Sequence, residues 1–240
     1  TAGLGPAKGE LLVFTDDDVI ADPQWLMHFA FAAQANADFS IFGGSIVPHW
    51  MKAPPAWLEK RIPMGVTYAV TDPHVSEGLV FPGLIWGANM MVRRSVFDSG
   101  LRFNESVGPA AGQYVMGSET EFNIRAASIG ARAYFVPSAK VAHIIREHQL
   151  DRQWILARAF RFGRNMWNQD SSSARDRSRT LLGMPRWRYR SYLTNRCMGI
   201  ASHLFGDKEA ALASDWDVYF LRGYFAEWWA GRHRRPGANP

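Results

Sequence analysis

The first part of the chain alternates short apolar, β-prone runs with stretches of helical spacing. Five runs predict strands, at residues 11–15, 40–47, 90–92, 133–136 and 141–145. Residues 23–36 predict a helix that begins at Asp22-Pro23 and carries one apolar stripe, formed by Trp25, Leu26, Phe29, Ala30, Ala33 and Ala37. A second helix is predicted from Ser118 to about Ile129, where Gly130 ends it. Strands interleaved with helices predict an α/β fold.

Glycine and proline interrupt this pattern at defined points. Gly43-Gly44 within a strand indicates a β-bulge or the close approach of a ligand or another backbone. The segment 48–63 is broken by prolines and is predicted not to form the interior of a sheet, and residues 64–82 are predicted to form a loop. Pro137 predicts a turn between the last two strands, the second of which carries His143.

Three consecutive carboxylates, Asp16, Asp17 and Asp18, follow the first predicted strand. Ligands bind at the carboxyl ends of strands in open α/β sheets, and a hard divalent cation such as Mg²⁺ or Mn²⁺ would offset the mutual repulsion of these groups. Asp16 and Asp18 are two residues apart and would point the same way on an extended chain. The alternative is a solvated loop that leads into the next helix.

Two glutamates lie at the start of the second helix. Ser118 as the N-cap and Glu121 three residues later form the pattern of a capping box, which gives Glu121 a structural role. Glu119 is not needed for that box and is free for chemistry.

Composition and charge divide the chain. Residues 1–145 carry 10 Lys/Arg and 13 Asp/Glu, a net charge of −3, whereas residues 146–240 carry 17 and 9, a net charge of +8. The basic part contains Arg and Trp at amphipathic spacing and predicts helices, with Trp154, Trp216, Phe220 and Trp228 on apolar faces. Such helices suit either an anionic membrane surface or packing onto protein, and the interleaved tryptophans argue against nucleic acid.

One cysteine, Cys197, excludes an internal disulfide and fits a reducing compartment. No apolar run reaches membrane-spanning length. The cytoplasm is the expected location, where the basic helices would allow contact with the inner face of the membrane. A first strand that already ends in an acidic cluster predicts neighbouring strands from an earlier segment, so we expect a fragment.

Several motifs in order resemble the inverting family 2 glycosyltransferases, which have the GT-A fold. The resemblance covers about residues 1–165 and consists of Phe14-Thr15-Asp16-Asp17-Asp18, Phe42-Gly43-Gly44, Pro54-Pro55 with Trp57, Gly87-Ala88-Asn89-Met90, Gly117-Ser118-Glu119-Thr120-Glu121, and Val136-Pro137 with His143. It implies a mixed sheet with flanking helices, to which the basic part of the chain adds a C-terminal helical extension. It also implies transfer of a sugar from a nucleotide-diphospho-sugar to a glycan or lipid-linked acceptor in cell-envelope or polysaccharide synthesis.

The resemblance implies roles for matching residues. Asp16 and Asp18 match the Asp-x-Asp motif that binds a divalent metal (Mn or Mg), and His143 matches the histidine that completes this site. Asp16 and Asp17 would contact the donor, and Gly87 and Asn89 would form the wall of the acceptor and sugar site. Glu119 falls at the general base, although this chain has Gly-Ser-Glu-Thr-Glu where the family has Gly-Glu-Asp-x-Glu, so Glu121 stays a second candidate.

The family's nucleotide-binding half would precede Thr1 and would comprise about one hundred residues. Residues 1–148 are therefore interpreted as a GT-A core without that half, inactive alone, and residues 149–240 as the basic extension. Two other functions fit less of the pattern. One is a non-catalytic membrane- or partner-binding module. The other is a phosphatase with an aspartyl nucleophile, for which a Gly-Thr should stand where Val19-Ile20 follow the acidic run.

Overall fold

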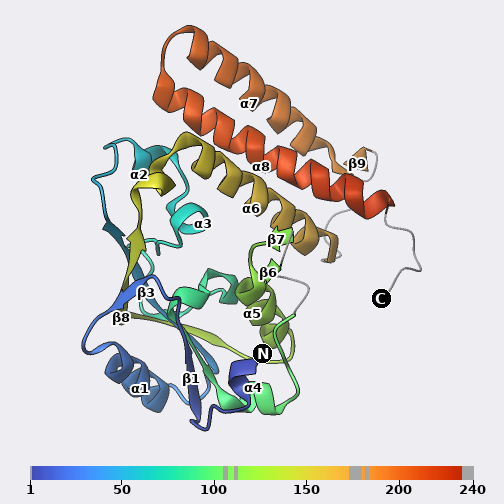
Figure 1. The fold of residues 1–240 in the computed structure, drawn as a ribbon. Helices are drawn as coiled ribbons and strands as arrows, with labels where there is room; N and C mark the ends of the chain where they lie inside the picture. The colour runs from blue at the N-terminus through green and yellow to red at the C-terminus, as the bar shows by residue number, and fades with distance from the viewer. Residues whose placement is uncertain (1, 105–107, 111–112, 173–179, 182–183, 234–240) are drawn as a thin grey trace. The chain divides into compact units, whose positions relative to one another are not determined.

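The computed structural model describes residues 2–104, 108–110, 113–172, 180–181 and 184–233 (Figure 1). The chain forms two compact units. The first comprises residues 1–53, 64–112 and 117–146, and the second comprises residues 54–63, 113–116 and 147–240. The second unit therefore begins its main run two residues before the predicted boundary and also includes two short segments from the first part of the chain.

A mixed sheet forms the centre of the first unit. The strand order is β1–β5–β3–β8–β2, with β4 also paired to β8, and the bounds are Leu11–Phe14 (β1), Val19–Ala21 (β2), Ile41–Trp50 (β3), Gly78–Leu79 (β4), Met90–Arg93 (β5) and Ala133–Ile145 (β8). β3 and β8 are parallel, and the other pairs are antiparallel. β1 lies at an edge of the sheet.

Alternation along the strands builds a core on each face of this sheet. Met90 and Val92 of β5 point to one face, where Phe97 and Phe122 pack, and Met91 points to the other, where Phe29 packs. The helical elements of the unit are Ala2–Leu4 (η1), Trp25–Ala35 (α1), Met64–Tyr68 (α3), Pro82–Leu84 (η2), Gly87–Asn89 (η3), Arg94–Asp98 (α4) and Ser118–Ser128 (α5). The strand Gly108–Ala110 (β6) completes the described elements. This arrangement is the α/β fold that the alternation predicts.

Four local predictions are corrected. The buried face of α1 is Phe29, Ala32 and Ala33, whereas Leu26 of the predicted stripe is 56% exposed. β3 continues through Pro48 to Trp50, because beyond Gly43 it pairs with β8 alone and the proline occupies a position with a neighbour on one side. β8 runs through Pro137 as one strand instead of turning there. Residues 64–68, predicted as loop, form α3.

Gly44 combines the two interpretations that the sequence left open. The register between β3 and β8 shifts between Gly44 and Ser45, so a bulge is present. A Cβ atom at Gly44 would lie 2.0 Å from the carbonyl oxygen of Ala139 and 2.4 Å from Nδ2 of Asn89. The close approach is therefore made by the protein's own backbone and by the Asn89 amide.

Three long helices dominate the second unit, as predicted for the basic part. They are Arg152–Ser172 (α6), Arg186–Leu204 (α7) and Lys208–His233 (α8), and α8 lies between α6 and α7 (Figure 1). The shorter elements are Leu58–Arg61 (α2), Gln113–Val115 (β7), Glu147–Leu150 (η4), Thr180–Leu181 (β9) and Met184–Pro185 (β10). α6 includes Ser171 and Ser172, and residue 173 lies outside the described residues.

Most of the predicted apolar residues of this unit pack inside it. Trp216 is 5% exposed and packs against Phe162 and Phe220, and Trp154 and Trp228 are half-buried. The packing alternative therefore describes these side chains. No helix in the described part of the chain is long and apolar enough to cross a membrane.

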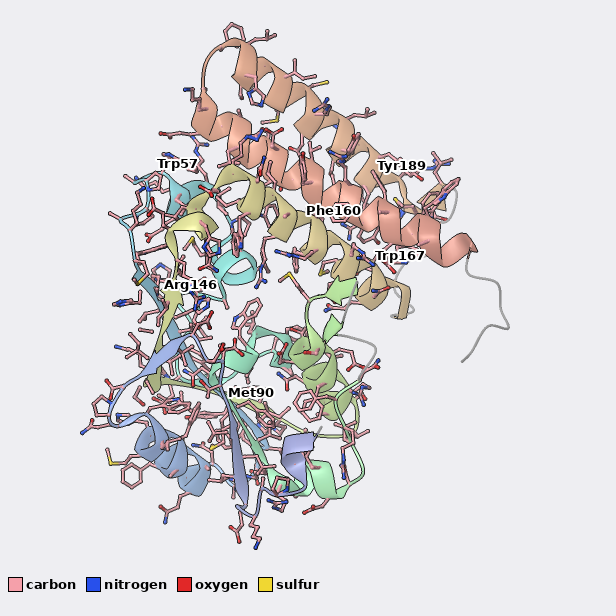
Figure 2. All side chains as sticks on the ribbon, viewed as in Figure 1. Trp57, Met90, Arg146, Phe160, Trp167 and Tyr189 are labelled. Atoms are coloured by element: carbon pink, nitrogen blue, oxygen red, sulfur yellow. The ribbon has the colours of Figure 1, made fainter. Side chains whose placement is uncertain are left out.

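Two glycines bring α6 and α8 into backbone contact. A Cβ atom at Gly163 would lie 1.9 Å from the carbonyl oxygen of Phe220, and one at Gly223 would lie 1.9 Å from that of Phe160, which Figure 2 labels on α6. Each glycine thus faces the other helix's backbone, which cannot rotate away as a side chain can.

We expect Gly223→Ala to lower the free energy of unfolding by about 1–3 kcal/mol or more, because the new methyl group forces the helices apart. Gly199→Ala is the matched control, since its Cβ would meet its nearest neighbours at an ordinary 3.5 Å. Urea unfolding followed by circular dichroism measures both. Equal stability of the two variants would contradict the close crossing.

Candidate active site

Strand pairing brings Asp18 and His143 together. β2 begins directly after Asp18 and is antiparallel to β8, with Val19 opposite His143. The Ile144 N–H donates a hydrogen bond of 2.8 Å to the Asp18 carbonyl oxygen, which fixes the backbone at this point. Nε2 of His143 then lies 3.4 Å from Oδ1 of Asp18, and the two side chains are 12% and 20% exposed.

The backbone also selects the tautomer of His143. Its Nδ1 lies 2.6 Å from the carbonyl oxygen of Tyr68, which can only accept a hydrogen bond. Nδ1 therefore carries a proton, and in the neutral ring the lone pair of Nε2 faces the Asp18 carboxylate. A cation placed between these two acceptor atoms, which lie 3.4 Å apart, would bind both.

Negative charge accumulates at the end of β1. Asp16 is exposed as a residue, but its carboxyl group is crowded by neighbouring atoms, and this partial loss of water raises its pKa. The charges of Glu119 and Asp18 raise the pKa of Asp16 further. Asp17 is exposed beside them. Asp16 therefore holds a proton more readily than an isolated carboxyl group does.

Glu119 lies directly against Gly87. A Cβ atom at Gly87 would be 2.5 Å from Cγ and 2.7 Å from Oε1 of Glu119. The turn that carries Gly87 is tied to the end of β1 by Thr15, whose hydroxyl donates a 3.2 Å hydrogen bond to the Ala88 carbonyl oxygen. A glycine at this position therefore allows the Glu119 carboxylate to lie beside the acidic cluster.

Glu121 is held by an ion pair, and the predicted capping box is wrong. The N-cap of α5 is Gly117, with φ 94°, and Ser118 is the first helical residue and makes no capping hydrogen bond. Arg125, one turn later, donates to both carboxylate oxygens of Glu121 at 2.5 and 2.9 Å. Glu121 has a structural role, as predicted, but a different one, and Glu119 remains the freer carboxylate.

Asn89 is fully buried and serves the fold. Its Oδ1 accepts a 2.7 Å hydrogen bond from Trp25, and its Nδ2 donates to the carbonyl oxygens of Ser45 and Ala139. These contacts join α1, the β3 bulge and β8. The role of Asn89 at the wall of the acceptor and sugar site stays a prediction, and in this structure its amide bonds to the protein's own atoms.

Two residues, Asp18 and His143, are placed to bind one divalent cation, instead of the three residues predicted. Ligand atoms around a Mg²⁺ or Mn²⁺ ion lie about 3 Å apart, close to the 3.4 Å between Asp18 and His143. Among the described residues, no three His, Cys, Asp or Glu side chains stand close enough to hold one ion together. Asp16 interacts electrostatically with both but does not complete a three-residue cluster.

Sequence reasoning missed two groups of this site. Arg146 follows the last residue of β8 (Figure 2), and its Nη1 lies 3.5 Å from Oδ2 of Asp18. The Tyr68 carbonyl oxygen fixes the His143 ring. Arg146 could have been predicted, because it directly follows a strand that carries His143. The contact of the Tyr68 carbonyl oxygen could not, because a backbone group leaves no pattern in the sequence.

The raised pKa of Asp16 gives a pH prediction. The Asp16 carboxyl group binds its proton more tightly in the folded state than in the unfolded state, where its pKa is near 3.8. Ionisation of Asp16 as the pH rises therefore destabilises the fold. Without divalent cations, Asp16→Asn should raise the melting temperature at neutral pH and have no effect below pH 3.8. Asp38→Asn is the control, because the Asp38 side chain is 86% exposed, and it should leave the melting temperature unchanged both at neutral pH and below pH 3.8. A lower melting temperature for Asp16→Asn at neutral pH would contradict the crowding of this carboxylate.

Comparison with known proteins shows similarity to transferases. The glucosyl-dolichyl phosphate glucuronosyltransferase of Haloferax volcanii is 24% identical over 163 residues, which cover 67% of this chain and 51% of the relative. The chain thus spans about half the length of this curated relative. No protein-family model matches the chain.

Among solved structures, the mannosyltransferase PcManGT from Pyrobaculum calidifontis, in complex with GDP-Man and Mn²⁺, superposes with a TM-score of 0.53 at 13% identity. The match covers 95% of this chain and 65% of PcManGT. The chain has the GT-A glycosyltransferase fold. The fold class predicted from the sequence is confirmed, and the similarity to a glycosyltransferase relative agrees with the predicted resemblance. S. aureus TarS in complex with UDP-GlcNAc also matches, over 98% of this chain and 72% of TarS at 13% identity, but its TM-score of 0.43 is too low to add support.

Proposed function

We propose that this chain is the catalytic part of a metal-dependent, inverting GT-A glycosyltransferase. The reaction would move a sugar from a nucleotide-diphospho-sugar to an acceptor hydroxyl. The observation that carries the proposal is the convergence of Asp18, His143, Asp16 and Glu119 at the ends of neighbouring elements, with the His143 tautomer fixed by a backbone carbonyl. The transferase relative and the fold support the same reaction class.

Asp18 and His143 are the residues that would hold the cation, with Asp16 beside them. A bound Mn²⁺ or Mg²⁺ would stabilise negative charge on the departing diphosphate. Arg146 is a cation of the chain itself at the same place, and its guanidinium would attract the diphosphate to the mouth of the site.

Glu119 is the proposed general base. Its carboxylate would accept the proton of the acceptor hydroxyl while that oxygen attacks the anomeric carbon from the face opposite the diphosphate. One displacement of this kind inverts the anomeric centre. Gly87 leaves the space in which this carboxylate lies, and the ion pair with Arg125 keeps Glu121 out of the reaction.

The acceptor side of the proposal is a glycan or lipid-linked hydroxyl in envelope or polysaccharide synthesis. The curated relative is named for a lipid-linked sugar, glucosyl-dolichyl phosphate, and PcManGT was solved with GDP-Man. A role as a binding module without catalysis is disfavoured by the convergence of the acidic residues and His143, because a scaffold has no need of that arrangement.

The test is sugar release and transfer by the longest natural protein that contains this chain, with a panel of GDP- and UDP-sugars and added Mn²⁺. We expect turnover of at least one donor, loss of turnover with a chelator, and recovery on addition of Mn²⁺. The anomeric configuration of the product, measured by NMR, should be opposite to that of the donor. Turnover that is insensitive to the chelator, or a product with retained configuration, would contradict the proposal.

A further inference from the structure

The helical unit contains an arginine-lined hollow that the transfer reaction does not use. The hollow has a volume of about 560 Å³, within the range of ligand sites, and its lining comes from α6, α7 and α8. Its polar residues include Arg152, Arg196, Arg222, His203, Asp215 and Tyr219. All of them belong to the second unit.

The charges in this hollow do not cancel. Asp215 is 7% exposed and accepts hydrogen bonds from Arg152 and from His203, the latter at 3.1 Å, so one arginine is compensated. Arg222 lies over the ring of Tyr219 at 4.8 Å. Within the described residues, no carboxylate lies in salt-bridge distance of Arg196 or Arg222. The hollow therefore carries about two uncompensated positive charges at neutral pH.

Apolar surface flanks these arginines. On α7, Leu193 and Ile200 are 64% and 48% exposed and lie three residues before and four residues after Arg196, so they share its face of the helix. A second hollow shares Arg152, Tyr219 and Arg222 with the first and is lined by Leu156, Ala157 and Phe160, of which Phe160 is labelled in Figure 2. The ligand that fits both features has an anionic head and an apolar body.

The composition of α7 points to the same kind of partner. The helix has four arginines and no acidic residue, and its exposed side chains include Trp187, Leu204 and Phe205 at or beside its two ends. Arginine heads among exposed aromatic and aliphatic side chains are typical of helices that lie at a membrane surface.

We propose that the arginine hollow binds the phosphate headgroup of an anionic phospholipid and docks the exposed face of α7 on the membrane surface. Arg196 and Arg222 contact the phosphate, Arg152 is held in place by Asp215, and Leu193 and Ile200 enter the interfacial region. This surface differs from the tryptophans first predicted for membrane contact, most of which are packed within the unit.

The experiment is co-sedimentation of the full chain with phosphatidylcholine vesicles, with and without phosphatidylglycerol. We expect binding that depends on phosphatidylglycerol and weakens as salt is added. The double variant Arg196→Gln/Arg222→Gln should bind at least about tenfold more weakly. The matched control Lys60→Gln/Arg61→Gln removes the same charge from exposed positions on α2 of the same unit, away from α7 and outside the hollow, and should lose less than about threefold. Equal losses in the two double variants would overturn the site.

Two further experiments test whether the apolar residues enter the membrane and whether the bound phosphate belongs to a lipid or to a soluble anion. Leu193→Ser, at an exposed position, should weaken vesicle binding by about threefold or more and leave circular dichroism unchanged. Inorganic phosphate, titrated by calorimetry, should bind far more weakly than the vesicles. Tight binding of inorganic phosphate without vesicle binding would overturn the lipid assignment and leave a site for a soluble anion. None of these experiments depends on sugar transfer. A negative result for lipid binding would therefore not contradict the proposed transferase function, and a negative transferase assay would not contradict lipid binding.

Discussion

Glu119→Gln is expected to lower kcat at least about 100-fold in the longest natural protein that contains this chain, with donor binding nearly unchanged. Glutamine keeps the shape of the side chain beside Gly87 but cannot accept the acceptor's proton, and removal of a general base typically costs a factor of about 10² to 10⁴. The measurement is steady-state transfer at saturating donor and acceptor, combined with calorimetry of donor binding.

Glu121→Gln is the matched control, two residues along the same helix. The variant removes the ion pair between Glu121 and Arg125, whose side chains are 25% and 38% exposed respectively. This loss should lower the free energy of unfolding by about 0.5 kcal/mol. Its kcat should stay within about threefold of the unmodified protein. A larger kinetic loss for Glu121→Gln than for Glu119→Gln would assign the base to Glu121.

Asp18→Asn is expected to weaken Mn²⁺ binding by more than about 100-fold and to remove metal-dependent transfer. Groups that only support a metal ligand cost about 10- to 100-fold when changed, so loss of a ligand itself should exceed that range. The fold should be retained, because the structural contact at this position is the hydrogen bond from Ile144 to the Asp18 backbone oxygen, which asparagine preserves. Calorimetric titration of Mn²⁺ into the chain measures the loss.

Asp38→Asn removes a carboxylate of the same unit from an exposed position and should leave Mn²⁺ affinity unchanged. If Asp18→Asn binds Mn²⁺ as tightly as the unmodified chain, the cation site lies elsewhere.

The strand and helix order could be predicted from the sequence because the apolar runs have the period of their structures. Met90, Met91 and Val92 are one example, because a strand buried on both faces is apolar at every position. The convergence of Asp18 and His143 was predictable from the family resemblance, which pairs a residue that follows the first apolar run with a residue inside the last one. The cleft position of Glu119 stays a prediction.

Other features depend on contacts between distant parts of the chain. The extension of β3 through Pro48 requires knowing that one side of the strand has no neighbour there, and the burial of Asn89 depends on three separate segments. The capping box failed for a local reason that the sequence did contain. Glu121 and Arg125 are four residues apart on α5, a spacing that allows an ion pair, and the Glu121 carboxylate pairs with Arg125 instead of capping the helix.

The most direct test of the account follows the imidazole signals of the chain's seven histidines by NMR while Mn²⁺ is added at substoichiometric amounts. Because Nδ1 of His143 donates to the Tyr68 carbonyl oxygen and Nε2 faces Asp18, the account predicts paramagnetic broadening of the His143 signal before any other. The same titration of Asp18→Asn should lose this selectivity. Broadening of a different histidine first, or of all seven together, would contradict a cation site between Asp18 and His143.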